Sequence, residues 1–255
     1  MPQKAQAGEL LREWRQRRRL SQLDLAIAAN VSSRHLSFIE TGRARPTTEM
    51  ILRLAEQLEV PLRDRNVLLL AGGYAPAYRE RGLADPELTA VRAALQRVLA
   101  GHRPYPAAVV NRWWELVDAN DGIALFTRHV TPELMQPPVN VLRLSLHPDG
   151  MAPRIVNLPE WRAHLLARLY RQAEATGDPR LFRLYDELEA YPGGQRRPKP
   201  PPEVVVPLRY RADQGELSFI SLTAVVGTPL DITVEELAIE SFYPADEATA
   251  AALRP

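Results

Sequence analysis

The stretch SSRHLSFIETGRARP, residues 32–46, decides how this chain is interpreted. Its first four residues are two serines, an arginine and a histidine, placed directly before a pattern in which Leu36 and Ile39 share one helical face. Ser32 or Ser33 is suited to cap that helix, because both carry a short side-chain oxygen acceptor. A first turn built from short polar side chains and one long cation predicts an edge that faces outward and contacts a polar partner.

Short helices flank this stretch on both sides. Ser21 begins a capping motif for the helix before it, after a turn that follows an earlier amphipathic segment. Thr47 or Thr48 caps a fourth helix, and a fifth is expected over residues 62–71. Five helices are therefore predicted within residues 1–72, and the tight turn between the second and third predicts a helix-turn-helix.

Residues 10–70 resemble the Xre-type, phage-repressor-like helix-turn-helix domain, which is a five-helix bundle. The resemblance is carried by Leu20-Ser21-Gln22, Leu25-Ala26, Val31-Ser32, Ile39-Glu40-Thr41-Gly42-Arg43 and Arg45-Pro46. It implies that the third helix enters the major groove of double-stranded DNA. The alternative is a helical bundle whose serines only cap helices and whose arginines are only solvated, and this alternative explains the caps alone.

The resemblance also implies roles for single residues. Arg34 would chelate guanine O6 and N7, and Phe38, one turn later, would press on a thymine methyl. Gln22 would contact a phosphate at a helix N-terminus. Arg15 and Glu40 match a structural ion pair and are assigned to the fold. The expected DNA-binding residues are Gln22, Ser32, Ser33, Arg34, His35, Ser37, Phe38, Arg43 and Arg45.

The charge distribution is uneven along the chain. Residues 1–81 hold 14 Lys/Arg and 9 Asp/Glu, a formal charge of +5, and the remainder carries −4. A basic module joined to a mildly acidic one favours an anionic partner for the first. The chain has no cysteine, which excludes disulfides and thiolate metal sites. No apolar run approaches the ~18 residues of a membrane span, so a cytoplasmic protein without a membrane partner is expected.

The second half is predicted to be α+β. A connector and a linking helix occupy residues 73–100, and the second domain occupies 101–255. Strands are expected at 107–111, 114–118, 204–210, 216–226 and 237–243, and helices at 120–126, 159–176, 178–190 and from 245. Alternating apolar residues over 139–146 favour a strand, although a short helix stays open. Six prolines between Pro192 and Pro207 predict an extended surface loop.

Residues 85–253 resemble the ligand-binding domain of MmyB-like transcription regulators, which is PAS-like. The resemblance is carried by Asn111-Arg112-Trp113-Trp114, Val141-Leu142-Arg143-Leu144, Gly227-Thr228-Pro229 and Glu240-Ser241-Phe242. The expected fold class is an all-α, five-helix, lambda-repressor-like domain followed by an α+β PAS-like domain with a five-stranded antiparallel sheet. In relatives the segment around Val141 is helical, against the alternation.

This second resemblance implies a fatty-acid-like or other lipophilic occupant in the concave space between sheet and helices. Arg143 could meet a carboxylate head group, but a salt bridge within the domain is favoured. The remaining candidates could equally be ordinary core residues: Trp114, Phe126, Leu142, Leu165, Leu169 and Phe219. The five histidines form no metal-binding pattern, and no phosphate-binding or nucleophile motif occurs, so no metal, other cofactor or catalytic residue is expected.

Together these features predict a homodimeric, DNA-binding transcription regulator of the repressor type. The helix-turn-helix domains of the two subunits would contact DNA half-sites about one helical turn apart. A bound ligand would alter the spacing between these two domains. Two alternatives stay open for the second half. It could be a ligand-free dimerisation or protein-docking module, or an enzyme that depends on acidic residues such as Asp149 or Asp231, for which turn roles are favoured.

Overall fold

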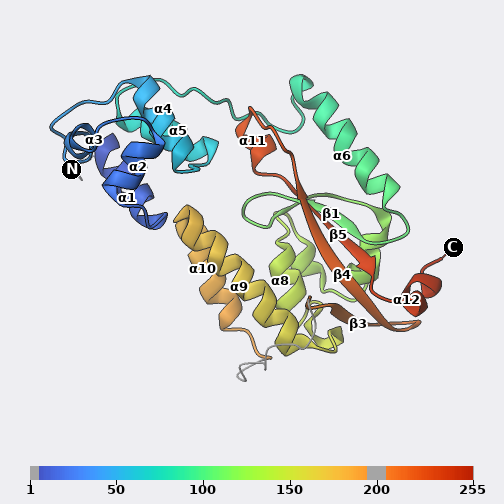
Figure 1. Ribbon diagram of the computed structural model, residues 1–255. Coiled ribbons are helices and arrows are strands. Elements are labelled where there is room, and N and C mark those ends of the chain that lie inside the picture. The colour runs from blue at the N-terminus through green and yellow to red at the C-terminus, as the bar shows by residue number, and fades with distance from the viewer. Residues whose placement is uncertain (1–5, 194–204, 255) are drawn as a thin grey trace. The chain divides into compact units, whose positions relative to one another are not determined.

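The computed structural model describes residues 6–193 and 205–254, and the chain forms two compact units (Figure 1). The first unit consists of Met1–Arg81 with two short segments, Glu174–Gly177 and Thr228–Glu235. The second unit contains the rest of the chain. Most of the predicted proline-rich loop falls within 194–204 and so lies outside the described residues.

The first unit contains the five predicted helices. They are α1 (Ala7–Arg17), α2 (Gln22–Ala28), α3 (Ser33–Glu40), α4 (Thr48–Gln57) and α5 (Leu62–Ala71). The side chains of Ser21, Ser32 and Thr47 each accept a hydrogen bond from a backbone N–H in the first turn of α2, α3 and α4. The helix caps are therefore Ser32, and not Ser33, for α3, and Thr47, and not Thr48, for α4.

The core of this unit collects apolar side chains from α1 to α5. Leu11, Leu36, Leu54 and Leu68 are fully buried within one cluster. Gly8 lets α1 approach α3 closely, because a Cβ at this position would lie 2.0 Å from the Ile39 carbonyl oxygen. The packing of α1 on α3 thus depends on a residue without a side chain.

We expect Gly8→Ala to lower the free energy of unfolding of the first unit by about 1–3 kcal/mol, the usual cost of overpacking. Amide hydrogen exchange of α3 and α4 reports this loss separately from the second unit. The control is Gly101→Ala near the end of a later helix, where a Cβ would meet nothing within 4 Å. Equal stability of both variants would contradict the close approach of α1 and α3.

The second unit is built on one antiparallel sheet of five strands in the order β2-β1-β5-β4-β3. The strands are β1 (Ala107–Val110), β2 (Leu116–Ala119), β3 (Leu208–Ala212), β4 (Gly215–Val225) and β5 (Ala238–Pro244). The predicted antiparallel sheet and the late three-stranded meander are both confirmed. The β1–β2 hairpin joins this meander where β1 pairs with β5, and Val109 lies opposite Ile239.

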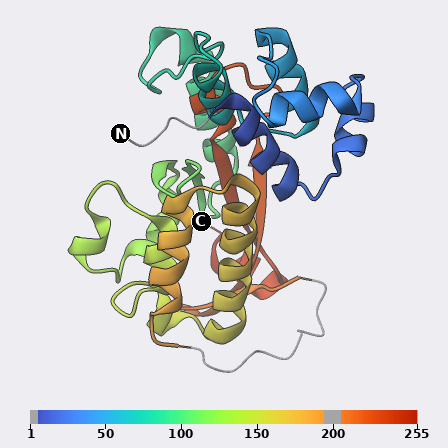
Figure 2. The same cartoon turned by 90° about the vertical axis from the view of Figure 1, so that its left-hand side faces the viewer.

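Helices cover both faces of this sheet. Further helices of the chain are α6 (Thr89–Gly101), α7 (Ala124–Thr127), α8 (Val141–Leu146), α9 (Leu158–Thr176), α10 (Pro179–Glu189), α11 (Ile232–Glu235) and α12 (Glu247–Ala252). Leu95 and Leu99 of α6 pack with Val109 on one face. On the opposite face α9 and α10 lie side by side, with α8 nearer the sheet (Figures 1 and 2). All four residues of β1 are buried, since side chains that alternate between the faces meet helices on both.

The strand favoured for residues 139–146 is wrong, because Val141–Leu146 forms the helix α8. The Asn140 side chain caps it by accepting hydrogen bonds from the backbone N–H groups of Leu142 and Arg143, both at 3.1 Å. Leu142, Leu144 and Leu146 are all buried even though they lie on different sides of the helix. A short helix that is buried on all sides has no polar face. Alternating apolar residues therefore do not distinguish such a helix from a strand.

Candidate nucleic-acid interface and apolar pocket

The helix-turn-helix is held by local hydrogen bonds. Ser21 and Asp24 form a capping box, in which Asp24 N–H donates to Ser21 Oγ at 3.1 Å and Ser21 N–H donates to Asp24 Oδ2 at 2.9 Å. The Ser21 hydroxyl also donates to Asp24 Oδ2 at 2.6 Å, and this bond, together with the one from the Ser21 backbone N–H, lowers the pKa of Asp24. Asn30 takes a left-handed conformation, with φ of 54°, in the turn between α2 and α3. The turn therefore sets the direction of α3 through backbone geometry and two serine caps.

The leading edge of α3 faces outward. Ser33, Arg34 and His35 are exposed, whereas Leu36 and Ile39 are buried in the core. Ser32 caps the helix by accepting from His35 N–H at 3.1 Å, so its own hydroxyl hydrogen stays available to an outside acceptor. This arrangement presents donors and acceptors at a helix N-terminus, as reading a groove requires.

Further along α3, Ser37 and Phe38 are half-buried. The Arg34 guanidinium lies 5.4 Å from the centroid of the Phe38 ring. This cation–π contact holds the long arginine along the helix and reduces the entropy lost when it binds a base edge. The roles expected for these residues in reading DNA stay predictions.

The expected structural ion pair is present beneath this edge. Arg15 Nε and Nη2 donate to the Glu40 carboxylate at 2.7 and 2.8 Å, and Gln22 Nε2 donates to Glu40 Oε2 at 2.8 Å. Burial alone raises the pKa of Glu40, but the hydrogen bonds from Arg15 and Gln22 and the charge of Arg15 hold it below its ordinary value. Gln22 keeps a second amide hydrogen for the phosphate contact expected of it.

Arg43 and Arg45 are exposed in the loop that follows α3. Arg45 Nη2 donates to the Gly72 carbonyl at 3.0 Å, and its guanidinium lies 5.5 Å from the centroid of the Tyr74 ring. Arg45 is therefore held in place, while Arg43 extends from the turn at Gly42, where φ is 72°. Their contact with the DNA backbone stays a prediction.

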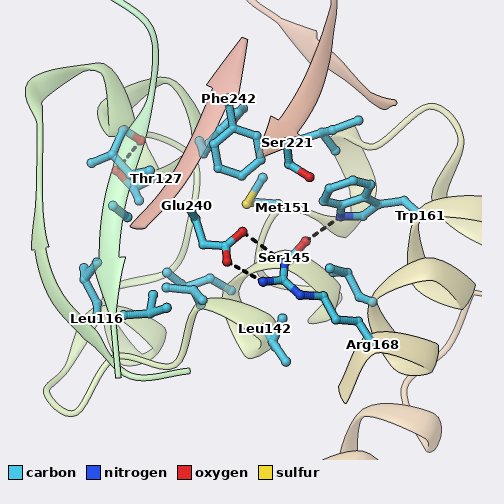
Figure 3. A pocket seen from close by; sticks show the side chains of 18 residues that line it. Leu116, Thr127, Leu142, Ser145, Met151, Trp161, Arg168, Ser221, Glu240 and Phe242 are labelled. Atoms are coloured by element: carbon cyan, nitrogen blue, oxygen red, sulfur yellow. Dashed lines mark hydrogen bonds and ion pairs between the residues drawn. The ribbon is translucent and has the colours of Figure 1, made fainter. Parts of the chain in front are cut away.

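The second unit contains a pocket between the sheet and the helices that cover it (Figure 3). Its cavity volume is about 80 Å³, below the range of drug-sized ligand sites, so the apolar character of its wall and not its size marks it as a candidate site. Most of the wall is apolar and comes from β1, β2, β5, α7, α8 and α9. The apolar wall residues are Ala108, Val110, Leu116, Ile123, Phe126, Val141, Leu142, Leu144, Met151, Trp161, Leu165, Leu208 and Phe242. We refer to this site as the sheet pocket.

Five polar side chains also line the sheet pocket: Thr127, Ser145, Arg168, Ser221 and Glu240. Arg168 Nη1 and Nη2 donate to the two oxygens of Glu240 at 3.0 and 2.6 Å, an ion pair visible in Figure 3. Thr223 completes the group by accepting from Arg168 Nη2 at 2.7 Å and donating to Glu240 at 3.0 Å. On the wall nearby, Trp161 Nε1 donates to Ser145 Oγ at 3.0 Å.

Three of the seven expected ligand-binding residues line the sheet pocket: Phe126, Leu142 and Leu165. Leu169 and Phe219 are not on its wall, because both are fully buried in the core behind it, where the Phe219 ring packs edge-on against Phe126. Periodicity predicts which face of an element is buried, but it does not separate a cavity wall from solid packing.

Trp114 is also absent from the pocket wall. Its backbone takes a left-handed conformation, with φ of 65°, and its Nε1 donates to Gln172 Oε1 at 2.8 Å. The Arg168 guanidinium lies 4.5 Å from the Trp114 ring centroid. Because a residue in the left-handed conformation cannot continue a strand, β2 begins at Leu116 and not at the predicted Trp114.

Arg143 pairs with Glu187 through two hydrogen bonds of 2.7 Å, outside the sheet pocket. The favoured salt bridge within the domain is thus present. Hydrogen bonding from Arg143 lowers the pKa of Glu187. The head-group contact suggested for Arg143 is corrected, because its guanidinium is already committed to a carboxylate on α10.

Sequence reasoning missed Arg168 and Glu240. The signal was present, because Glu240 alternates with Phe242 on the inward face of β5, where a charge is unexpected. Arg168 lies three residues after Leu165 on α9 and so shares its face. A charge at an inward strand position predicts a partner on the covering helix, although the pattern does not say which residue it is.

An exposed reading edge in a helix-turn-helix, joined to a separate pocket-bearing unit, defines a DNA-binding transcription regulator. A family model described as a helix-turn-helix domain matches residues 6–68. A second, described as the MmyB-like transcription regulator ligand binding domain, matches residues 91–255. The chain therefore belongs to the family of MmyB-like transcription regulators, and the predicted order of a helix-turn-helix domain followed by an MmyB-like ligand-binding domain is confirmed. No curated protein matches the chain.

The described residues contain neither a metal-binding cluster nor a membrane-spanning helix. No group of three or more histidine or acidic side chains is placed to hold a metal ion in residues 6–193 and 205–254. No described helix is both long enough and apolar enough to cross a membrane.

Proposed function

We propose that this regulator acts in the cytoplasm as a homodimeric repressor whose affinity for its operator is set by a small lipophilic molecule in the sheet pocket. The observation that carries the proposal is the pocket itself, whose wall holds 13 apolar residues between the sheet and the covering helices. An apolar wall of this kind stabilises a lipophilic ligand through the hydrophobic effect, at about 25 cal/mol per Å² of apolar surface buried.

The dimer follows from the way a single short recognition helix reads DNA. One α3 edge covers only a few base pairs, and two copies related by a twofold axis contact two half-sites one helical turn apart. A ligand that binds one spacing of the two copies better than another shifts the population toward it, and with it the affinity for DNA. The proposal that the protein is a repressor rests on the resemblance of its helix-turn-helix domain to phage repressors.

The experiment is to denature the purified full-length protein and identify by mass spectrometry any small molecule it releases. Operator affinity is then measured with and without that molecule. We expect a lipophilic compound in near-stoichiometric amount and a change in operator affinity when it is added. A protein that releases nothing and shows no thermal shift with any lipid tested would favour the ligand-free docking module.

A matched pair of variants tests where the molecule is held. Leu116 lies on the wall of the sheet pocket and Leu222 is an exposed strand residue away from it. We expect Leu116→Trp to abolish retention, because the indole fills space that the ligand occupies, and Leu222→Trp to leave retention unchanged. Loss of retention in both, or in neither, would contradict this location.

A further inference from the structure

The final part of β4 has an unpaired edge. β3 lies along β4 only as far as Phe219, which stands opposite Leu208, the first residue of β3. On its other side β4 is paired with β5 as far as Val225. Residues 205–207, which are described and precede β3, form no bridge with β4. Within residues 6–193 and 205–254, the segment 221–225 is therefore paired on one side alone.

The backbone groups of alternate residues in this segment point out of the sheet. The Ser218 carbonyl accepts from the N–H of Ala245, just beyond β5, at 2.8 Å, so the even-numbered residues of β4 turn toward β5. Because strand residues alternate, the N–H and C=O groups of Ser221, Thr223 and Val225 turn the other way. None of these groups has a hydrogen-bond partner among the described residues.

The outer strands of the sheet, β2 and β3, are covered along their open sides. In β2, which has four residues, Leu116 N–H donates to the Val139 carbonyl at 2.7 Å. In β3, the Arg209 carbonyl accepts from Val156 N–H at 2.8 Å. Native proteins protect an edge with a covering segment, a charge, a proline or a bulge, because a bare edge pairs readily with another strand.

The β4 edge carries no such protection in the part of the chain that the structure describes. Residues 221–225 have the sequence SLTAV, which contains neither a charged residue nor a proline. Their register with β5 is continuous, so no bulge turns this edge away from solvent. Val225 is 69% exposed. An uncharged, exposed strand end with unpaired backbone groups is a template for a further strand.

The segment is suited to pair with a second copy of itself. In an antiparallel arrangement about a twofold axis at Thr223, Ser221 lies opposite the partner's Val225 and Thr223 lies opposite the partner's Thr223. Each of these pairs exchanges two hydrogen bonds, so every outward backbone group gains a partner. A twofold axis also brings each side chain near its own counterpart, where like charges would repel. The absence of charge from SLTAV removes that cost.

We infer that two copies of the chain pair through residues 221–225 of β4, antiparallel about a twofold axis at Thr223. The pairing joins the sheets of the two copies into one continuous sheet. This inference rests on the proposed function, since it assigns the interface of the homodimer proposed there.

A proline at the edge tests the pairing. Val225→Pro removes an N–H that turns away from β5, so the ladder with β5 is kept while each copy loses one donor to the other. We expect the dissociation constant of the dimer, measured by sedimentation of the full-length protein, to rise at least about tenfold. The control Val225→Ala keeps the N–H and should weaken the dimer at most about threefold.

Two outcomes of this measurement separate the interface from the dimer itself. If Val225→Pro dimerises as tightly as the unaltered protein, the inference is overturned and the homodimer stands. If the unaltered protein stays monomeric at every concentration, the homodimer of the proposed function fails together with its interface.

Cross-linking fixes the register, because the chain has no cysteine of its own. In Thr223→Cys the two Cα atoms face each other across the axis at about 5.5 Å, within the span of a disulfide, so mild oxidation should give a covalent dimer. In Val225→Cys the two sulfurs belong to residues about 13 Å apart along the strands and should not link. Linking in both variants, or in neither, would contradict this pairing. The cysteine variants keep every backbone N–H, so they decide the matter if Val225→Pro does not fold.

Discussion

Glu40→Ala is expected to lower the free energy of unfolding of the helical unit by about 3–5 kcal/mol, the usual cost of removing one partner from a buried ion pair. The side chains of Arg15 and Glu40 are only 11% and 1% exposed. Without Glu40 the guanidinium stays buried with its charge uncompensated, and Gln22 loses its acceptor. Hydrogen exchange of α3 and α4 under increasing denaturant measures the loss.

Two controls separate the buried pair from ordinary surface charge. Glu49→Ala removes an exposed partner of Arg53 on α4, and its cost should stay below about 0.5 kcal/mol. Replacing both members of the buried pair, as Arg15→Met with Glu40→Leu, should recover much of the stability, because no unpaired charge is left. If Glu40→Ala costs no more than Glu49→Ala, the pair has no structural role.

The same pair predicts a pH dependence of stability. The pKa of Glu40 in the folded unit lies below its ordinary value, so the unfolded chain binds the proton more readily. The stabilising contribution of Glu40 is therefore complete above the ordinary carboxyl pKa and is lost as the pH falls through the lowered value. The stability difference between the unaltered protein and Glu40→Ala should shrink on acidification.

Arg34→Ala is expected to abolish preference at one base pair of each half-site, a loss of about 10- to 100-fold in discrimination. The physical reason is the fork of N–H donors that an arginine at the exposed edge of α3 can offer to a guanine. Operators selected from a randomised duplex library with the unaltered protein and with the variant would show the change. Selection of identical sequences by both would contradict the reading role of Arg34.

Arg43→Ala provides the contrast, because a phosphate contact carries no sequence information. It should weaken binding to all sequences alike and reduce the slope of log K against log salt by about 0.9 for each phosphate that is no longer neutralised. Arg53→Ala serves as a control, since Arg53 is a surface arginine of α4 paired with Glu49. Changes in stability alone for Arg34→Ala and Arg43→Ala would contradict both assignments.

The helical unit could be predicted closely because its signals are local. Ser21 and Ser32 cap helices through hydrogen bonds to residues three positions away, and the buried leucines follow at helical spacing. The buried pair of Arg15 and Glu40 came from the family resemblance and not from any local pattern. The strands of the second unit were likewise placed to within a few residues by alternation and turns.

The sheet pocket was harder to predict for a physical reason. Phe126 and Phe219 carry the same signal in the sequence, an aromatic residue on a buried face, yet only Phe126 reaches the pocket wall. Which buried residue borders empty space depends on how α8 and α9 pack on the sheet, and no local pattern encodes that distance.

The sequence by itself determined the two-part architecture, the capped helix α3 with its exposed first turn, and the positions of the strands. Each of these features depends on patterns among residues that are close in the chain. The tertiary structure decided that Val141–Leu146 is a helix, that Arg143 pairs with Glu187, and that Arg168 meets Glu240. The two ion pairs join residues far apart in the chain, and the helix is buried on all sides only because distant elements enclose it. Burial and charge pairing across such distances are settled only when the whole unit has packed.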